Sequence, residues 1–252
     1  MLLISRRSFL KLCAGTVTSL YFFKETYLAI AASQQIPVLL YHRVGYSKGD
    51  LTVTPERFNR DLLRLHDHGY QTISLAQFQS LMAGNNVSIP DKPLLITFDD
   101  GYADNYENAY VSLLNHGMTA LFFIITGLLA TTDRLTPVQI KEMQQNGMSF
   151  GSHTMSHRAL ADLTLADMEV ELNSSRTTLE NILRIPIDTV SYPRGRYTAA
   201  TIKMAGQCGY HYGFTTIYGS CYPGSAPFEL RRIPVFSYDN DIISVINKRR
   251  YG

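Results

Sequence analysis

Two groups of polar residues in the sequence have the types and the spacing of a metal site. Asp99 and Asp100 are adjacent in the string Thr-Phe-Asp-Asp-Gly-Tyr, and His153 and His157 stand four positions apart. Neighbouring side chains leave an extended chain in different directions, so one carboxylate can bind a cation while the other faces a substrate. On one turn of a helix, two histidines with this spacing can face the same ion. One aspartate and two histidines leave positions open for water and substrate, and they suit zinc, iron, cobalt or nickel.

Either group alone also has a structural interpretation. An Asp-Asp-Gly turn is commonly a solvated strand exit, and a His-x-x-x-His pair is commonly incidental. Their joint appearance after successive predicted strands favours the functional interpretation, because short apolar runs alternate with helical patterns from Ile36 onward. Strands are predicted at residues 37–41, 71–74, 93–98, 119–125, 148–151, 189–191, 210–215 and 230–233. Helices are predicted at 75–82, 109–114 and 165–183, and two more begin at Thr54-Pro55 and Thr136-Pro137.

This order of elements predicts where the polar residues meet. Strands separated by helices imply βαβ units and a mainly parallel sheet, for which closure into an α/β barrel is the natural arrangement. Parallel barrels place their chemistry at the carboxyl ends of their strands. Five candidate residues come just after a predicted strand: His42, Asp99, Asp100, His153 and Arg194. We therefore expect them on one rim of the barrel.

The two motifs resemble those of the polysaccharide deacetylase family, also called the NodB homology domain or carbohydrate esterase family 4. The Thr-Phe-Asp-Asp-Gly-Tyr string and the later Gly-Ser-His-Thr-Met-Ser-His string carry the resemblance, which covers about residues 37–235. It implies a distorted (β/α) barrel with fewer complete strands than the usual eight. It also implies that Asp99 is the general base and that Asp100, His153 and His157 bind the metal.

The third motif of that family is altered in this chain. Its usual form is Arg-x-Pro-Tyr-Gly, whereas residues 191–195 read Ser-Tyr-Pro-Arg-Gly. The resemblance implies that the backbone N–H after the proline, here that of Arg194, contacts the oxyanion. The missing arginine usually steadies the catalytic aspartate, and Arg232 is our preferred replacement. The alternative for Arg232 is a solvated basic pair ahead of an edge strand.

The general acid is also expected at an unusual place. The family's carboxyl-terminal Leu-x-His motif is absent, because no histidine follows His211. Instead, the string Pro-Val-Leu-Leu-Tyr-His places His42 after the first predicted strand. This resembles the permuted branch of the family, which includes the poly-β-1,6-N-acetylglucosamine deacetylases and takes its acid histidine from the first strand. We expect His42 to be the acid, with a buried structural histidine as the alternative.

The amino-terminal residues resemble an export signal. The string Ser-Arg-Arg-Ser-Phe-Leu-Lys precedes an apolar run at residues 12–23, and Ala-Ile-Ala at 29–31 offers the small residues that signal peptidases prefer. We predict a twin-arginine-type (Tat) signal over residues 1–31 and a catalytic domain over 32–252, located in the periplasm or at the extracytoplasmic face of the membrane. An ordinary amphipathic helix is the alternative. An uncleaved signal would associate the protein with the membrane.

The composition limits the other partners. The net charge is +2 without a basic block, which argues against nucleic-acid binding. Tryptophan is absent, so any aromatic platform for sugars must consist of tyrosine or phenylalanine. Cys13, Cys208 and Cys221 form no CxxC pair, which disfavours a thiolate zinc site. In an oxidising compartment Cys208 and Cys221 could pair, but their spacing does not decide this.

These features predict a metal-dependent hydrolase that removes N-acetyl groups from the amino sugars of a polysaccharide, such as poly-N-acetylglucosamine or a cell-wall glycan. Zinc is the expected ion, with cobalt, nickel or iron as alternatives. Three other functions stay open: an O-acetyl polysaccharide esterase, a non-catalytic glycan-binding protein on the same scaffold, and a metal phosphodiesterase. The last is disfavoured because the sequence offers no second metal cluster.

Overall fold

The computed structural model describes residues 35–251, and the signal predicted for residues 1–31 lies outside them. Seven parallel strands form a closed ring, because β1 pairs with both β5 and β10. In ring order they are β1 (Val38–Tyr41), β5 (Lys92–Phe98), β6 (Leu121–Ile124), β7 (Ser149–Ser152), β8 (Thr189–Ser191), β9 (Tyr212–Tyr218) and β10 (Leu230–Pro234). A further strand, β4 (Tyr70–Thr72), pairs with the start of β5, and β2 (Arg43–Val44) pairs with β3 (Thr52–Val53). The expected α/β barrel is confirmed.

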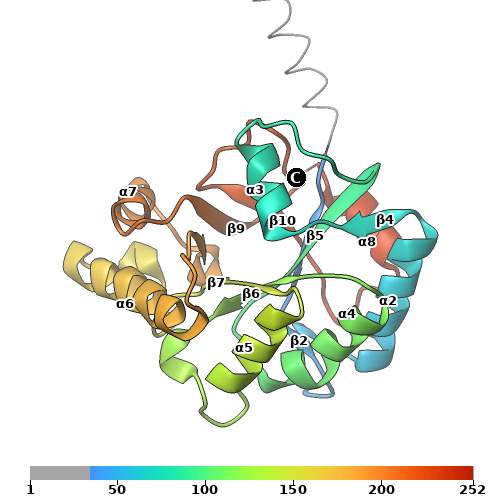
Figure 1. The fold of residues 1–252 in the computed structure, drawn as a ribbon, viewed down its shortest axis with the longest axis horizontal. Coiled ribbons are helices and arrows are strands. Elements are labelled where there is room, and N and C mark those ends of the chain that lie inside the picture. The colour runs from blue at the N-terminus through green and yellow to red at the C-terminus, as the bar shows by residue number, and fades with distance from the viewer. Residues whose placement is uncertain (1–34, 252) are drawn as a thin grey trace, which may run out of the picture.

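Helices surround this ring of strands (Figure 1). They are α2 (Pro55–Asp67), α3 (Leu75–Met82), α4 (Val111–Asn115), α5 (Pro137–Gln145), α6 (Leu165–Leu183), α7 (Ala199–Gln207) and α8 (Ile242–Arg249). Thr54, Thr136 and Thr164 cap three of them by accepting a hydrogen bond from a backbone N–H of the first turn. The helix predicted at 109–114 begins earlier, as a π-helix over Asn105–Tyr110 that leads into α4.

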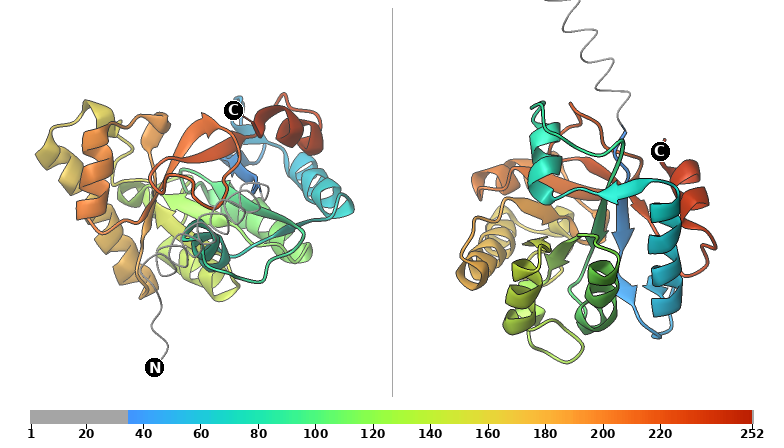
Figure 2. Two further views of the ribbon diagram at one scale, coloured as in Figure 1. Left: turned by 90° about the horizontal axis from the view of Figure 1, so that it is seen from above. Right: turned by 45° about the vertical axis from the view of Figure 1, so that its right-hand side comes forward.

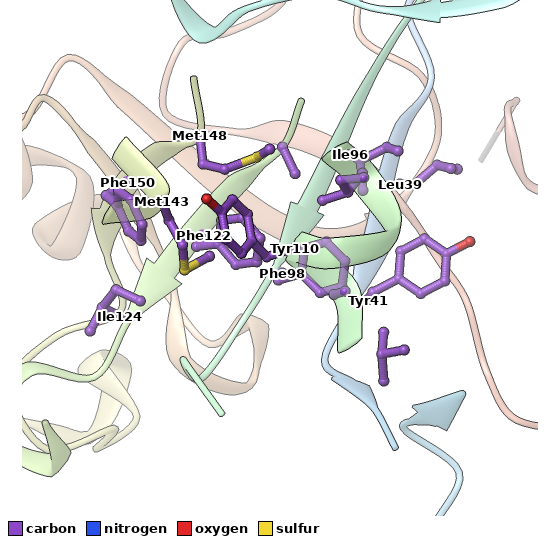
Figure 3. Close-up of a cluster of buried hydrophobic side chains, with 14 of the residues drawn as sticks. Leu39, Tyr41, Ile96, Phe98, Tyr110, Phe122, Ile124, Met143, Met148 and Phe150 are labelled. Atoms are coloured by element: carbon purple, nitrogen blue, oxygen red, sulfur yellow. The ribbon is translucent and has the colours of Figure 1, made fainter. Parts of the chain in front are cut away.

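A row of aromatic rings crosses four neighbouring strands inside the protein (Figure 3). Tyr41, Phe98, Phe122 and Phe150 occupy matched positions of β1, β5, β6 and β7. Neighbouring rings stack with centroids 5.6, 4.8 and 5.8 Å apart, and all four are buried. Each contributes about 1.5–3 kcal/mol by leaving water. His42 directly follows Tyr41, and Asp99 directly follows Phe98. The stacked rings therefore fix the register of β1 and β5, which places His42 and Asp99 at the same level of the barrel.

The parallel ring gives the molecule two different ends. All carboxyl ends of the strands form one rim, and in the right-hand view of Figure 2 the blue strand β1 points down towards it. The described chain starts at the opposite end, where Ile36 precedes β1, and α8 returns there from the rim. The side chain of Arg250 donates from Nε to Oε1 of Gln35 at 3.1 Å. The two ends of the described chain are therefore in contact.

Two further features bear on the sequence predictions. Cys208 and Cys221 are both buried free thiols, so they do not form the disulfide that the sequence left open. Between residues 35 and 251, no helix has the length and apolar character needed to cross a bilayer.

Candidate active site

Three side chains converge on one point of the rim, in the manner of a metal site. Potential ligand atoms of Asp100, His153 and His157 all lie within 4.8 Å of one another. Oδ1 of Asp100 lies 3.4 Å from Nε2 of each histidine. This oxygen is buried and has no hydrogen-bond partner within residues 35–251. A divalent cation fits this set, because it would satisfy the buried oxygen and suits one carboxylate and two imidazoles.

The chain bends sharply to bring these ligands together. Asp100 has a φ of 76° and Gly101 a φ of 65°, both in the left-handed region. At Gly101 a side chain would also approach Ile124 to 3.0 Å, so the turn after β5 requires glycine. The left-handed conformation at Asp100 is costly for a residue with a side chain, which is typical of functional sites.

His153 and His157 do not lie on one helical turn, the arrangement in which their spacing would let both face the same ion. Residues 153–157 form an irregular loop after β7, with left-handed φ values of 64° at Thr154 and 61° at His157. The reason is competition for the backbone: the carbonyls of Thr154 and Met155 accept from the N–H groups of Thr126 and Gly127, at 3.1 and 2.7 Å. They are therefore not available for a helix. The two histidines meet through loop geometry instead.

Helix α6 holds this histidine loop from the other side. The buried carboxylate of Glu171 accepts hydrogen bonds from both the backbone N–H (2.8 Å) and the hydroxyl of Ser156, which lies between the two histidines. One helical turn further, Ser175 contacts the hydroxyl of Ser152 at 2.8 Å, and that hydroxyl accepts from the Thr154 N–H. The loop that carries His153 and His157 therefore depends on two polar residues of α6 that sequence reasoning missed. Helical periodicity could have identified these two residues. It puts Glu171 and Ser175 on the same buried face of α6 as Met168, Leu172 and Leu179.

Asp99 is held differently from its neighbour. Its two carboxylate oxygens each accept a hydrogen bond of 2.8 Å from the guanidinium of Arg232. Both residues are buried, at 2% and 0% exposure. Burial by itself raises the pKa of Asp99, but the charge of Arg232 and then that of His153 outweigh it and hold this pKa well below its ordinary value. Asp99 is therefore ionised and fixed in orientation.

The altered third motif takes part in the same cluster. The hydroxyl of Ser191 donates to Asp99 at 3.0 Å and accepts from Arg232 at 2.8 Å. Its carbonyl oxygen also contacts Nδ1 of His153 at 2.8 Å. A serine at this position thus links Asp99 to His153 of the candidate metal group, a contact that sequence reasoning did not foresee. Arg232 enters from β10, far along the chain from the family's usual arginine position.

His42 faces the same cluster from the end of β1. Burial lowers its pKa, whereas the negative charges of Asp99 and Asp100 oppose the change. Its Nδ1 atom is buried without a hydrogen-bond partner among the described residues. The side chain of Asn105, in the π-helix, fixes the backbone by donating to the His42 carbonyl at 2.8 Å.

Arg194 occupies the turn after β8. It has a left-handed φ of 58°, its side chain is exposed, and its backbone N–H makes no hydrogen bond within residues 35–251. Gly195 follows with a φ of 65°, and a side chain there would come within 1.9 Å of the Thr216 hydroxyl. The turn therefore presents a free N–H donor, and the guanidinium of Arg194 is close enough to help lower the pKa of His157 after burial and His153.

Known proteins are similar to this chain in sequence and in fold. A profile described as polysaccharide deacetylase matches residues 86–213. The Bacillus subtilis protein YxkH, described as a polysaccharide deacetylase, is 37% identical over 201 residues, or 80% of this chain and 71% of that protein. A poly-β-1,6-N-acetyl-D-glucosamine N-deacetylase of Staphylococcus epidermidis is 25% identical over 215 residues, or 80% and 73%. The structure of the Streptococcus pyogenes deacetylase PplD in complex with acetate superposes with a TM-score of 0.79 at 29% identity, over 86% of this chain and 99% of that one.

Proposed function

The chain belongs to the polysaccharide deacetylase family, and we propose that it is a metal-dependent enzyme that hydrolyses the N-acetyl groups of amino sugars in a polysaccharide. The observation that carries this proposal is the position of Asp99: an ionised carboxylate clamped by Arg232, directly beside the group formed by Asp100, His153 and His157. The three-residue group would hold the ion and leave Asp99 free for proton transfer.

Each residue of the candidate site has a separate role in the proposed reaction. An ion bound by Asp100, His153 and His157 supplies Lewis-acid polarisation of the acetyl carbonyl and of water. Asp99 takes a proton from the attacking water while Arg232 and Ser191 keep its carboxylate in place. The backbone N–H of Arg194 donates to the developing oxyanion. Protonated His42 gives its proton to the leaving amine as the carbon–nitrogen bond breaks, so the products are acetate and a free amino sugar.

Several finer points are part of the proposal. Zinc is the first choice of ion, with cobalt, nickel or iron as alternatives. The Staphylococcus epidermidis relative, together with His42 on the first strand, supports poly-N-acetylglucosamine or a related glycan as the substrate. We also propose export by the twin-arginine-type signal, which a fusion of residues 1–34 to a reporter tests. Export that persists after substitution of both arginines at positions 6 and 7 would contradict this.

Acetate release from N-acetylglucosamine oligomers tests the function. Protein stripped of metal should be inactive and should recover when zinc or cobalt is added back. Asp99→Asn should abolish acetate release while retaining the bound metal, whereas His153→Ala should lose both. Full activity of either variant would refute the assignment. Release from acetylated xylan but not from the oligomers would instead identify an O-acetyl esterase.

A further inference from the structure

One short piece of chain carries the candidate base and also contacts the backbone of the candidate acid. This 99–105 segment follows β5, and its last residue opens the π-helix Asn105–Tyr110. Asp99 and Asp100 at its start belong to the candidate site. Asp104 and Asn105 at its end bind residues 42–45, the segment that follows β1. π-Helices are rare and occur frequently at functional sites, yet the proposed reaction gives this one no role.

Asn105 makes the contact to the candidate acid itself. Its side chain is buried, at 0% exposure, and Nδ2 donates to the carbonyl oxygen of His42 at 2.8 Å. The same nitrogen donates to Oδ1 of Asp104 at 3.3 Å. Because both partners are acceptors, the amide must turn its nitrogen towards them. A buried side chain in one orientation therefore holds the main chain at His42.

Asp104 holds the residues that come next in the 42–45 segment. Its Oδ1 accepts from the backbone N–H of Val44 at 3.4 Å, and its Oδ2 accepts from Nε of Arg43 at 2.7 Å. The guanidinium of Arg43 also lies over the ring of Tyr102, 4.3 Å from its centroid. The 42–45 segment is therefore bound to the 99–105 segment through more than one residue.

These contacts relate the acid to the base through one continuous piece of backbone. Asp99 and Asn105 are only six positions apart in the sequence. Strands β1 and β5 pair directly, with Tyr41 opposite Phe98, so the pairing sets the level at which both strands end. It does not set the direction that the backbone takes after β1, and Asn105 holds that direction. The direction matters because a misplacement of about 1 Å can cost about 100-fold in rate.

We propose that Asn105 is a positioning residue for the general acid: by holding the backbone of His42, it keeps the imidazole where it can protonate the leaving amine. This inference rests on the proposed function. Asn105 is buried and acts only through His42. Its replacement should therefore impair the step that needs the acid while the metal group and Asp99 stay in place.

Two substrates with different leaving groups separate the acid's step from the rest of the reaction. When the carbon–nitrogen bond of an N-acetylglucosamine oligomer breaks, the amine nitrogen takes the proton of His42. 4-Nitrophenyl acetate releases a phenolate, which leaves without a proton. Asn105→Leu should lower kcat for the oligomer about 10- to 100-fold. It should change KM, ester hydrolysis and zinc affinity far less, whereas Asp99→Asn should lose both activities.

The chain offers a matched control in the same π-helix. Asn108 donates from Nδ2 to the carbonyl of Val44 at 2.8 Å, which is the same kind of bond two residues after His42. Asn108→Leu should leave the ratio of the two activities unchanged. Thermal unfolding followed by circular dichroism checks that the variants are folded. Asn105→Asp keeps the size of the side chain but lacks its N–H donors, and it should show the same selective loss if Asn105→Leu does not fold.

A double-mutant cycle tests whether Asn105 acts through the acid. His42→Asn alone should lower oligomer hydrolysis about 10²–10⁴-fold. Adding Asn105→Leu should then cost little more, because the group that Asn105 positions is gone. Equal losses of the two activities in Asn105→Leu, or full additivity of the two substitutions, would overturn the positioning role.

A measurement without substrate keeps this inference separate from the proposed function. The Cε1–H signal of the His42 ring in an NMR spectrum is assigned by its loss in His42→Asn. It should split or broaden in Asn105→Leu, since the ring is no longer held in one place, and stay single in Asn108→Leu. A single, sharp signal in Asn105→Leu would overturn the inference even for an active deacetylase. If wild type released no acetate from any glycan while this signal split, the proposed function would fail and Asn105 would still position His42.

Discussion

Removal of Arg232 tests the buried pair at the centre of the site. This residue is fully buried, and its guanidinium makes two 2.8 Å hydrogen bonds to Asp99. In Arg232→Met, an apolar side chain takes over part of the volume, and among the described residues the carboxylate of Asp99 keeps only the hydroxyl of Ser191 as a hydrogen-bond partner. Losing one partner of a buried ion pair costs about 3–5 kcal/mol. We expect the free energy of unfolding of the metal-free protein to fall by this amount near neutral pH.

The loss should depend on pH in a direction that identifies Asp99. In the wild type, burial raises the pKa of Asp99, but Arg232 outweighs it and the pKa lies below its ordinary value of 3.8. The ionised carboxylate therefore adds stability at all pH values above that ordinary value. Without the guanidinium, burial raises the pKa, and the carboxylate destabilises the fold increasingly as pH rises above the ordinary value. The difference between variant and wild type should be larger at about pH 7.5 than at about pH 4.5.

Urea unfolding followed by circular dichroism measures these free energies. A double-mutant cycle with Asp99→Asn isolates the pair, because the neutral asparagine removes the charge that Arg232→Met leaves unpaired. The double variant should therefore be more stable than Arg232→Met alone. In acetate release, Arg232→Met should lose a large part of the about 10²–10⁴-fold that a positioned base contributes. The reasoning is refuted if Arg232→Met stays within about 1 kcal/mol of wild type near neutral pH, or if the double variant is no more stable.

Three further predictions concern the surroundings of the site. Glu171→Ala should weaken zinc binding in a metal-competition titration about 10- to 100-fold, because Ser156 in the histidine loop loses its hydrogen-bond acceptor. Glu171→Gln keeps an acceptor oxygen and should restore most of the affinity. Equal zinc affinities of the wild type and both variants would contradict this prediction. In the metal-free protein, burial holds the pKa of His42 below its ordinary value of 6.5. Unfolding then takes up a proton below that pH, so the stability that His42 contributes is complete above pH 6.5 and is lost as pH falls below it. His42→Asn should flatten this decline between about pH 6.5 and 5, and an identical decline in the variant would contradict the lowered pKa. Cys208 and Cys221 should react with a thiol reagent only after unfolding, since both are buried and free; a shift in gel mobility on reduction of the unfolded chain would contradict the free thiols.

Patterns of strand and turn allowed the barrel and its rim to be predicted. Apolar runs located every strand of the ring, because strands buried on both faces are continuously apolar. The helices at Leu75–Met82 and Leu165–Leu183 were predicted from their residue pattern at the observed bounds, and in the structure Ser74 and Thr164 cap their starts. Helices α7 and α8 were missed.

The geometry of the site was predictable only in part. Residue types and spacing identified one aspartate and two histidines as a potential metal group, and the family resemblance implied Asp100, His153 and His157, but neither predicted the loop that joins the histidines. That loop depends on hydrogen bonds to Thr126, Gly127 and Glu171. These residues are close to the loop in space but distant from it in the sequence. Long-range contacts of this kind leave no periodic trace in a sequence. The same reason explains why the link from Ser191 to Asp99 was not foreseen.

The contact between Gln35 and Arg250 bears on the order in which a sequence can arrange the strands and helices of this barrel. In the ring of strands β10 pairs with β1, and Gln35 and Arg250, near the two limits of the described residues, meet at the end of the molecule away from the rim. A few residues joining these ends would make the backbone circular without disturbing the rim. The same barrel could then be opened in the polar loop at residues 84–90, giving a gene with a different first residue but the same three-dimensional site. Whether the histidine that we propose as the acid stands first or last in such a sequence then depends only on where the circular backbone is opened.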